Sequence, residues 1–195
     1  MGAQQQLSGL DRAVADLAQR VAPSVVEIRS GNGVGAGTIW RSDGLIVTNH
    51  HVVPSDRTEI HLQDGRSLQG YVIARDIGND LAVVGVNASG LRAMTPRTTP
   101  PRPGELALAI GHPFGMRHIV ALGIIATTAG QGDGFERPLI RADVTLGPGN
   151  SGGPLVDANG LVIGINAMIG GGLALAVPSR LAEGLVRAVV ARAAA

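Results

Sequence analysis

A serine among small, turn-forming residues is the strongest chemical signal in this chain. It lies in Gly149–Pro154, which reads Gly-Asn-Ser-Gly-Gly-Pro. A nucleophilic serine needs a sharply turned backbone that exposes the hydroxyl and aims N–H groups at a reacting carbonyl oxygen. Glycine permits the positive φ angles and the close backbone approach that this requires. Similar runs occur in ordinary loops, so Ser151 is a candidate nucleophile only if a base and an acid accompany it.

Both partners precede the serine in the chain. Thr48–Val53 contains two adjacent histidines directly after the apolar run Leu45–Val47, and Asp80 opens the apolar run Leu81–Val84. The order His, Asp, Ser is that of the chymotrypsin-type catalytic triad, whose members meet in space and not in sequence. A serine hydroxyl is almost inert at neutral pH without a base, and an imidazole can take its proton and return it to a leaving amine. The three motifs therefore predict acyl-transfer chemistry.

With these motifs in this order, the chain resembles the HtrA/Deg family of trypsin-like serine proteases. The likeness runs from Val21–Val26 to Ala176–Ser179. It includes Gly111–Gly115, which reads Gly-His-Pro-Phe-Gly where the family usually has Gly-Asn-Pro-Phe-Gly. The resemblance implies an all-β, trypsin-like fold of two antiparallel six-stranded β-barrels with short N- and C-terminal helices.

Two pairs of neighbouring residues compete for the base and the acid. The family pattern Thr-Asn-x-His-Val indicates His51 as the base, with His50 as its rival. Asp80 leads into an apolar run, which suits a buried acid that orients a histidine. Asp76 precedes a turn composition, so stabilising that turn is its simpler role. The expected triad is His51, Asp80 and Ser151.

The resemblance also implies an oxyanion hole and a specificity pocket. The expected oxyanion donors are the N–H groups of the serine loop, and the pocket base is six residues before the serine. None of the pocket residues is charged, which favours small or aliphatic residues before the scissile bond; the alternative is that they are ordinary core and loop residues. The oxyanion residues are Gly149, Asn150 and Ser151, and the pocket residues are Thr145, Ala167, Met168, Ile169 and Gly172.

Asn150 bears on activation. Digestive trypsin-like enzymes have at this place an aspartate that pairs with a newly cut N-terminus, and a neutral asparagine cannot form that ion pair. We therefore expect control through loop ordering, with the glycine-rich segment Gly130–Arg137 as the candidate loop.

The composition is that of a globular protein without a special binding class. The chain has 195 residues, 45% hydrophobic and 2% aromatic, so Val, Ile, Leu and Ala must fill its core. A formal charge of +1 and scattered arginines give no case for nucleic-acid binding. There is no cysteine, no histidine pattern at metal-ligand spacing and no run of transmembrane length. We expect no cofactor, no metal and no membrane insertion.

Short apolar runs separated by turns predict the β structure. Helical spacing of Leu7, Leu10, Val14, Leu17 and Val21 predicts an N-terminal helix, capped by Ser8 and ended before Pro23. A second helix is expected after Pro178, capped by Ser179, with its buried side formed by Leu181, Leu185, Val189 and Val190. The twelve runs predicted as strands are Val25–Arg29, Gly35–Trp40, Leu45–Thr48, Glu59–Leu62, Tyr71–Ala74, Leu81–Val86, Leu106–Ile110, Ile119–Ala126, Leu139–Arg141, Pro154–Val156, Leu161–Ile165 and Leu173–Val177.

A proline-rich stretch divides the strands. Because residues 94–104 hold four prolines, they cannot form a central strand and are expected to connect the two barrels. The expected division of a single protease domain is the N-terminal helix and first barrel at 1–93, the connector at 94–104, the second barrel at 105–178 and the C-terminal helix at 179–195. The active site is then expected in the cleft between the barrels.

The resemblance implies an ATP-independent serine endopeptidase that cuts unfolded or misfolded proteins in protein quality control. Two alternatives stay open: a chaperone-like peptide-binding module with little turnover, and a processing protease for one partner. An extracytoplasmic location (periplasm or cell envelope) is expected from the family, although Met1–Gln6 does not resemble a signal peptide. Family trimers use N-terminal aromatic residues, and residues 1–39 contain none, which argues against a trimer. The family usually continues into PDZ domains, which this chain does not include.

Overall fold

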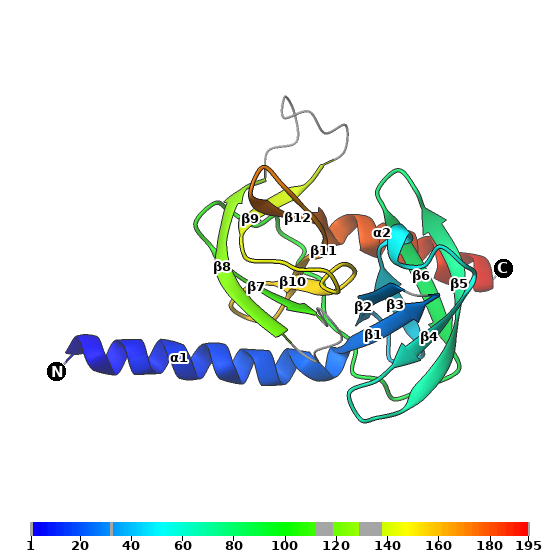
Figure 1. The fold of residues 1–195 in the computed structure, drawn as a ribbon, viewed down its shortest axis with the longest axis horizontal. Coiled ribbons are helices and arrows are strands. Elements are labelled where there is room, and N and C mark those ends of the chain that lie inside the picture. Colours follow the sequence, from blue (N-terminus) through cyan, green and yellow to red (C-terminus); the bar gives the residue numbers. More distant parts are fainter. Residues whose placement is uncertain (1, 32, 112–118, 129–137, 195) are drawn as a thin grey trace.

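Two closed antiparallel β-barrels form the body of the protein, which confirms the predicted fold class (Figure 1). The computed structural model describes residues 2–31, 33–111, 119–128 and 138–194. The candidate activation loop Gly130–Arg137 and the residues His112–Gly115 lie outside these ranges. All twelve predicted strand runs coincide with strands to within a few residues at each end.

The six strands follow one another around both barrels in the same order, read in opposite directions. The first barrel closes in the order β1-β2-β3-β6-β5-β4, and the second in the order β10-β11-β12-β9-β8-β7. The first barrel consists of β1 (Val25–Ser30), β2 (Gly33–Ile39), β3 (Leu45–Thr48), β4 (Arg57–His61), β5 (Ser67–Asp76) and β6 (Leu81–Val86). The second consists of β7 (Leu106–Gly111), β8 (Ile119–Thr127), β9 (Ile140–Asp143), β10 (Pro154–Val156), β11 (Val162–Gly170) and β12 (Leu173–Pro178).

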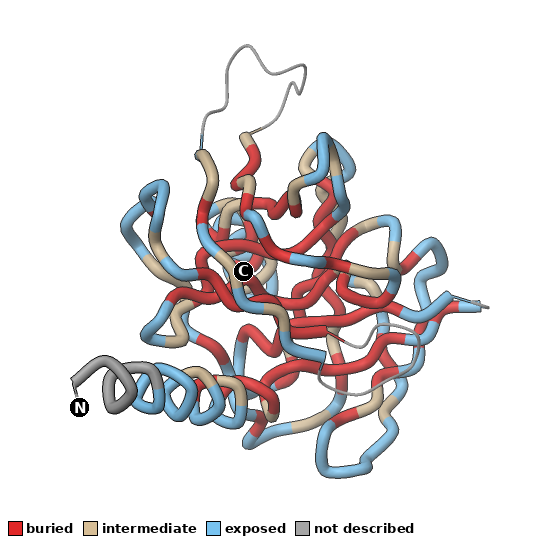
Figure 2. The backbone as a smooth tube through the Cα atoms, turned by 60° about the vertical axis from the view of Figure 1, so that its left-hand side comes forward, coloured by how far each residue is buried: buried red, intermediate tan, exposed pale blue. Residues whose placement is uncertain are grey.

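Three apolar clusters account for the buried interior seen in Figure 2. The first barrel is filled by β-branched and leucine side chains such as Ile28, Ile46 and Ile60. The second uses smaller residues, including Ala107, Ala142 and Ala176, together with isoleucines and leucines. The third cluster lies between the barrels, where Val25, Val47 and Val83 join Ile110, Ile165 and Val177. Strands that face both a barrel interior and this interface are buried on both sides, which is why they are continuously apolar.

The N-terminal helix is longer than predicted. Helix α1 spans Gly2–Val21 and is followed by a short 3₁₀ turn at Ala22–Ser24 that contains Pro23. Ser8 lies inside the helix, so its prediction as the N-cap was wrong. Leu17 and Val21 are buried against the interface cluster, whereas Leu10 is exposed. The helix therefore docks through its last turns, and Figure 1 shows its N-terminal half extending past the second barrel.

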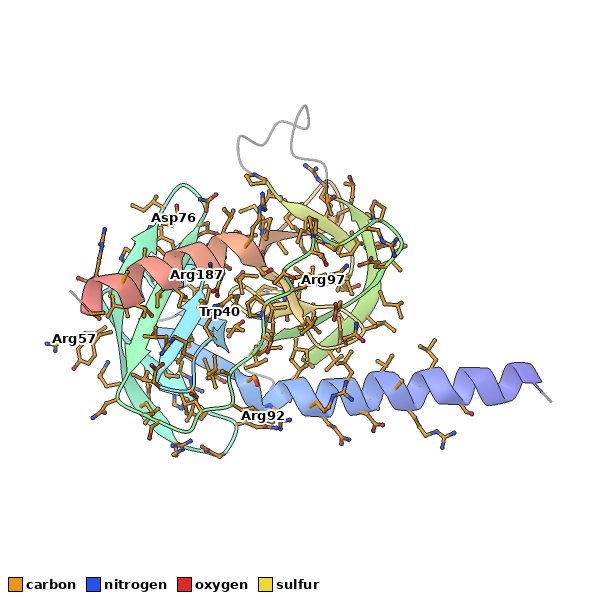
Figure 3. All side chains as sticks on the ribbon, turned by 180° about the vertical axis from the view of Figure 1, so that it is seen from behind. Trp40, Arg57, Asp76, Arg92, Arg97 and Arg187 are labelled. Carbon is orange, nitrogen blue, oxygen red and sulfur yellow. The ribbon has the colours of Figure 1, made fainter. Side chains whose placement is uncertain are left out.

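Helix α2 (Ser179–Ala193) leaves the second barrel and packs across the first. Trp40 at the end of β2 donates its indole N–H to Glu183 Oε2 at 2.8 Å, and Glu183 also accepts from Arg187 one turn later (Figure 3). Ala182 and Val186 are the buried apolar side chains, while the predicted stripe of Leu181, Leu185, Val189 and Val190 is only partly buried around them. Ser179 makes no cap hydrogen bond; its hydroxyl donates to the carbonyl of Arg97 at 3.4 Å.

The proline-rich segment lies between β6 and β7 and is fastened by one arginine. Backbone hydrogen bonds join Arg97 N to Val162 O and Val162 N to Thr95 O. The Arg97 guanidinium donates to Glu105 at 2.6 Å and lies 3.5 Å from Asp157. Hydrogen bonds from Arg97 and Arg102 lower the pKa of Glu105 to about 2. The connector is thus held to the second barrel by charge as well as by backbone pairing.

This carboxylate predicts a defined acid sensitivity. Because its pKa is lowered in the folded state, Glu105 contributes stability that is complete above its ordinary pKa of 4.5 and is lost as pH falls toward about 2. Glu105→Gln should lower the urea midpoint clearly at about pH 6, and at about pH 3 less than half of that difference should remain. Urea unfolding of both proteins at the two pH values measures this. An equal difference at both would contradict the assignment.

Candidate active site

Four hydrogen bonds join the histidine segment to Asp80. The single 3₁₀ turn His50–Val52 follows β3, and Asp80 ends the turn between β5 and β6. The Asp80 carbonyl accepts from His50 N at 3.2 Å and from Asn49 Nδ2 at 2.9 Å. Its carboxylate accepts from His51 N at 3.1 Å and contacts His51 Nδ1 at 2.8 Å. Backbone and side chain of one residue therefore fix both the position and the ring of His51.

The tautomer of His51 follows from this pair. A carboxylate only accepts hydrogen bonds, so Nδ1 carries the proton and Nε2 presents a free lone pair. The imidazole is 48% exposed and the Asp80 side chain only 12% exposed. The acid is thus shielded behind the ring, while the ring faces solvent. This is the arrangement that a general base needs.

Asp80 has a backbone conformation that is unusual for its residue type. Its φ is +56°, and among the described residues it is the only non-glycine residue with a positive φ. Left-handed backbone is disfavoured for residues with a Cβ, although aspartate tolerates it better than most. The hydrogen bonds to residues 49–51 compensate for that cost. Such strain is common at functional sites.

The rival residues have other partners. The His50 ring contacts Arg75, with 3.1 Å between His50 Nδ1 and Arg75 Nη1. Asp76 accepts from Asn79 N at 3.0 Å and from Asn79 Nδ2 at 2.7 Å. Asp76 therefore stabilises the turn that leads to Asp80, as its sequence context suggested.

The serine loop is built around a tight turn. Asn150 N donates to Gly147 O at 3.1 Å, with Pro148 and Gly149 at the two central positions and a Gly149 φ of +99°. Proline followed by a positive-φ glycine is the signature of a type II turn. Among the hydrogen bonds between described residues, none uses the N–H of Gly149 or of Ser151. The N–H of Asn150 is already used in the turn, so two of the three expected oxyanion donors remain available.

Strand β2 of the first barrel supports this loop of the second barrel. Ala36 N donates to Ser151 O at 2.8 Å, and Thr38 Oγ1 donates to Gly152 O at 3.2 Å. At the neighbouring Gly35, a Cβ would lie 2.5 Å from a methyl group of Val52, next to His51, and 3.3 Å from Ser151 O. Gly35 therefore allows the serine loop and the histidine turn to approach the same short stretch of backbone.

The hydroxyl of Ser151 donates to the carbonyl of Ala167 at 2.8 Å. Ser151 is half-buried, and among the described residues no hydrogen bond joins it to His51. Hydrogen bonds between a nucleophile and its base are often absent without substrate and form in the complex.

Most of the residues predicted to form the pocket lie in the β11–β12 hairpin itself. Ala167 is buried, while Met168 and Ile169 are 39% and 57% exposed. Gly172 is exposed in the hairpin turn with a φ of +78°. Thr145 follows β9, which pairs with β12 at Ala142 and Ala174; continuing this antiparallel register brings Thr145 level with the turn.

Comparison with known proteins supports what the geometry indicates. The family model for trypsin-like peptidase domains matches residues 35–165. The chain belongs to the trypsin-like peptidase family. Its relatives are HtrA/Deg proteases: a putative serine protease HhoB of Synechocystis is 39% identical over 161 residues, covering 77% of this chain and 39% of that protein. A probable periplasmic DegP-like endoprotease of Chlamydia trachomatis is also 39% identical, over 78% of this chain and 33% of that protein.

Solved structures agree with this placement. The HtrA-type protease AlgW with a tripeptide superposes with a TM-score of 0.83 at 34% identity, covering 91% of this chain and 63% of that one. A serine endoprotease of Yersinia pestis gives 0.82 at 29% identity, covering 91% of this chain and 66% of that one. This trypsin-like peptidase spans about two fifths of the length of the curated relatives that it matches.

Sequence reasoning missed several supports of the trypsin-like site. Thr38 and Thr48 are fully buried polar residues, and the Thr48 hydroxyl donates to Ala36 O at 2.7 Å. Arg75 was not singled out either, although an arginine directly before a turn, on the strand that leads to a candidate acid, is a usable signal. These residues act through contacts between distant segments, which spacing along the chain does not reveal.

The serine loop yields a test of close backbone approach. Gly152 has a φ of +88°, and a Cβ there would lie 2.0 Å from Ala36 O. Gly65 has a similar φ of +91° but open space around it. At either site, an alanine in left-handed backbone lowers the free energy of unfolding by about 1–2 kcal/mol. At residue 152, overpacking lowers it by about a further 1–3 kcal/mol. Chemical denaturation should therefore show Gly152→Ala to be the more destabilising by roughly that second amount; equal losses would contradict the contact.

Proposed function

We propose that this serine peptidase domain uses His51, Asp80 and Ser151 as its catalytic triad. The observation that supports this most is the 2.8 Å contact between His51 Nδ1 and Asp80 Oδ2, next to a serine loop fastened to the strand that the histidine turn packs on. In this scheme Ser151 Oγ leaves Ala167 and attacks the substrate carbonyl carbon. His51 Nε2 takes the hydroxyl proton and gives it to the departing amine, and Asp80 stabilises the imidazolium.

The negative charge that develops on the substrate carbonyl oxygen needs donors. The N–H groups of Gly149 and Ser151 are the proposed oxyanion hole, because both lack another partner among the described residues. Each such donor is worth about 10²–10³ in turnover. Water then attacks the acyl-enzyme ester and gives a proton to His51 Nε2; as the ester bond to Ser151 Oγ breaks, His51 returns that proton to Oγ and the new C-terminal acid leaves.

The proposed specificity follows from the lack of charge. Thr145, Ala167, Met168, Ile169 and Gly172 carry no charged group and would form a small apolar pocket. A lysine or arginine before the scissile bond would lose hydration there without gaining an ion pair. We propose a preference for valine, alanine, leucine or isoleucine at that position.

The proposed substrates are unfolded or misfolded proteins. Ser151 is half-buried where the two barrels meet, so a peptide bond reaches it only in an extended, locally unfolded chain. Names of the relatives, such as the probable periplasmic endoprotease of Chlamydia trachomatis, support an endopeptidase that acts outside the cytoplasm. No described helix is long and apolar enough to cross a membrane.

Covalent labelling tests the triad without an assumed substrate. A fluorophosphonate probe should modify Ser151 in the wild-type protein, as located by peptide mass mapping. Ser151→Ala should remove labelling and cleavage, and Asp80→Asn should lower the rate about 10⁴-fold because it disturbs the His51 tautomer. His50→Ala is the control for the neighbouring histidine and should retain most of the labelling. Loss in His50→Ala but not in His51→Ala would reverse the assignment of the base.

Peptide mapping tests the pocket. Digestion of reduced, unfolded β-casein should give cleavage mainly after small and aliphatic residues. Thr145→Asp would place a carboxylate at the proposed base of the pocket and should raise cleavage after arginine and lysine relative to the wild type. Wild-type cleavage mainly after basic residues would overturn the proposed specificity. Binding of casein by Ser151→Ala without turnover would show that a chaperone-like activity coexists.

A further inference from the structure

The catalytic histidine lies on a very short element. The turn His50–Val52 is a single 3₁₀ turn without a side-chain cap. Its own backbone bonds are Val52 N to Asn49 O at 3.2 Å and Val53 N to His50 O at 3.1 Å. A single turn of this kind has little stability by itself. Its position must therefore come from contacts with the rest of the barrel.

Arg75 supplies further contacts to this turn and to the residues that follow it. Its Nη1 donates to Val53 O at 2.6 Å and contacts His50 Nδ1 at 3.1 Å. Its Nη2 donates to Ser55 O at 3.1 Å and to Asp56 Oδ1 at 3.0 Å. One guanidinium thus binds four groups between residues 50 and 56, and its side chain is only 21% exposed.

The same hairpin provides both anchors. Arg75 is on β5 and pairs with Ala82 on β6, while Asp80 lies in the turn that joins these strands. The histidine turn is therefore held by the carboxylate from one end of the hairpin and by the guanidinium from the adjacent strand. Because both anchors belong to the β5–β6 hairpin, they hold the histidine turn in place relative to Asp80.

We infer that Arg75 is a positioning residue for His51, which fastens the segment 50–56 to the hairpin that carries Asp80 and engages His50 so that only His51 faces the acid. This rests on the proposed triad. Arginine suits the role because its planar fork donates in several directions at once. His50 accepts the Arg75 hydrogen bond at Nδ1, and this bond fixes the orientation of the His50 ring.

Substitution of Arg75 tests this inference. Arg75→Met removes the four contacts but keeps an apolar stem of similar length. A misplacement of about 1 Å costs about 10²-fold in rate. Fluorophosphonate labelling of Ser151 should therefore fall about 10²-fold in Arg75→Met. Arg75→Lys should recover part of the loss, because an ammonium can reach Val53 O but cannot form the whole fork.

The matched control is Arg57→Met. Arg57 is an exposed arginine on the neighbouring strand β4, at the outer edge of the first barrel (Figure 3), where its guanidinium stacks 5.9 Å from the centre of the Tyr71 ring. This variant makes the same change in charge and should label like the wild type.

A spectroscopic readout separates positioning from a general loss of stability. The proton between His51 Nδ1 and Asp80 should give a strongly downfield NMR resonance in the wild type and in Arg57→Met. That resonance should be weakened or lost in Arg75→Met while the methyl spectrum of the two cores stays native. If Arg75→Met is unfolded, the same comparison is made with Arg75→Lys, which should label more slowly than the wild type and show a broadened resonance.

The outcomes distinguish the two proposals. No labelling of Ser151 in the wild type would reject the proposed triad. Labelling in the wild type and equal labelling in folded Arg75→Met or Arg75→Lys, with the downfield resonance unchanged, would reject the positioning role and leave the triad intact.

Discussion

The hydrogen bonds of Asp80 to the histidine turn are the interaction on which the rest of the site depends. The Asp80 carboxylate contacts His51 Nδ1 and so determines the tautomer of His51. The Asp80 carbonyl accepts from His50 N and so fixes the backbone directly before His51. To make both contacts with the histidine turn, Asp80 adopts a φ of +56°. The hairpin β5–β6 and the bonds of Asp76 to Asn79 stabilise this strained conformation. The geometry of the proposed catalytic pair is thus obtained by concentrating local strain in one well-supported residue.

The proposed nucleophile, Ser151, comes from the other barrel, so the interface between the barrels is part of the geometry of the proposed triad. Ser151 and Gly152 are bonded through their carbonyls to Ala36 N and Thr38 Oγ1 on β2, and the apolar cluster around Val25, Ile110 and Val177 surrounds the junction. Interiors packed at crystal-like density do not deform continuously. The distance between serine and histidine therefore depends on a packed interface, and Trp40–Glu183 adds a polar tie from α2 to the first barrel.

The sequence was sufficient for the elements and insufficient for the contacts between them. Short apolar runs separated by turn residues located every strand because periodicity is a local property. Cap residues were predicted less well. Ser8 lies inside α1, and this helix docks through the leucines and valines of its last turns. Local sequence context favoured Asp80 over Asp76 as the partner of the histidine, and in the structure Asp80 contacts His51 while Asp76 binds Asn79. The role of Asp80 as the catalytic acid stays a prediction. Arg75, Thr38 and Thr48 act across long sequence separations, where a single chain gives no periodic signal.

The contact of Ser151 Oγ with Ala167 O gives the resting site a physical interpretation. A serine hydroxyl has one proton to donate, and while Ala167 accepts it, His51 cannot. Ala167 belongs to the hairpin proposed to form the pocket, so a substrate residue that enters there meets the same backbone segment that holds the hydroxyl. In the proposed mechanism, occupation of the pocket and transfer of the hydroxyl proton to His51 are then coupled by geometry. Only a productively bound chain displaces the Ala167 contact. Binding energy used for this displacement therefore raises selectivity at the chemical step and does not tighten ground-state binding.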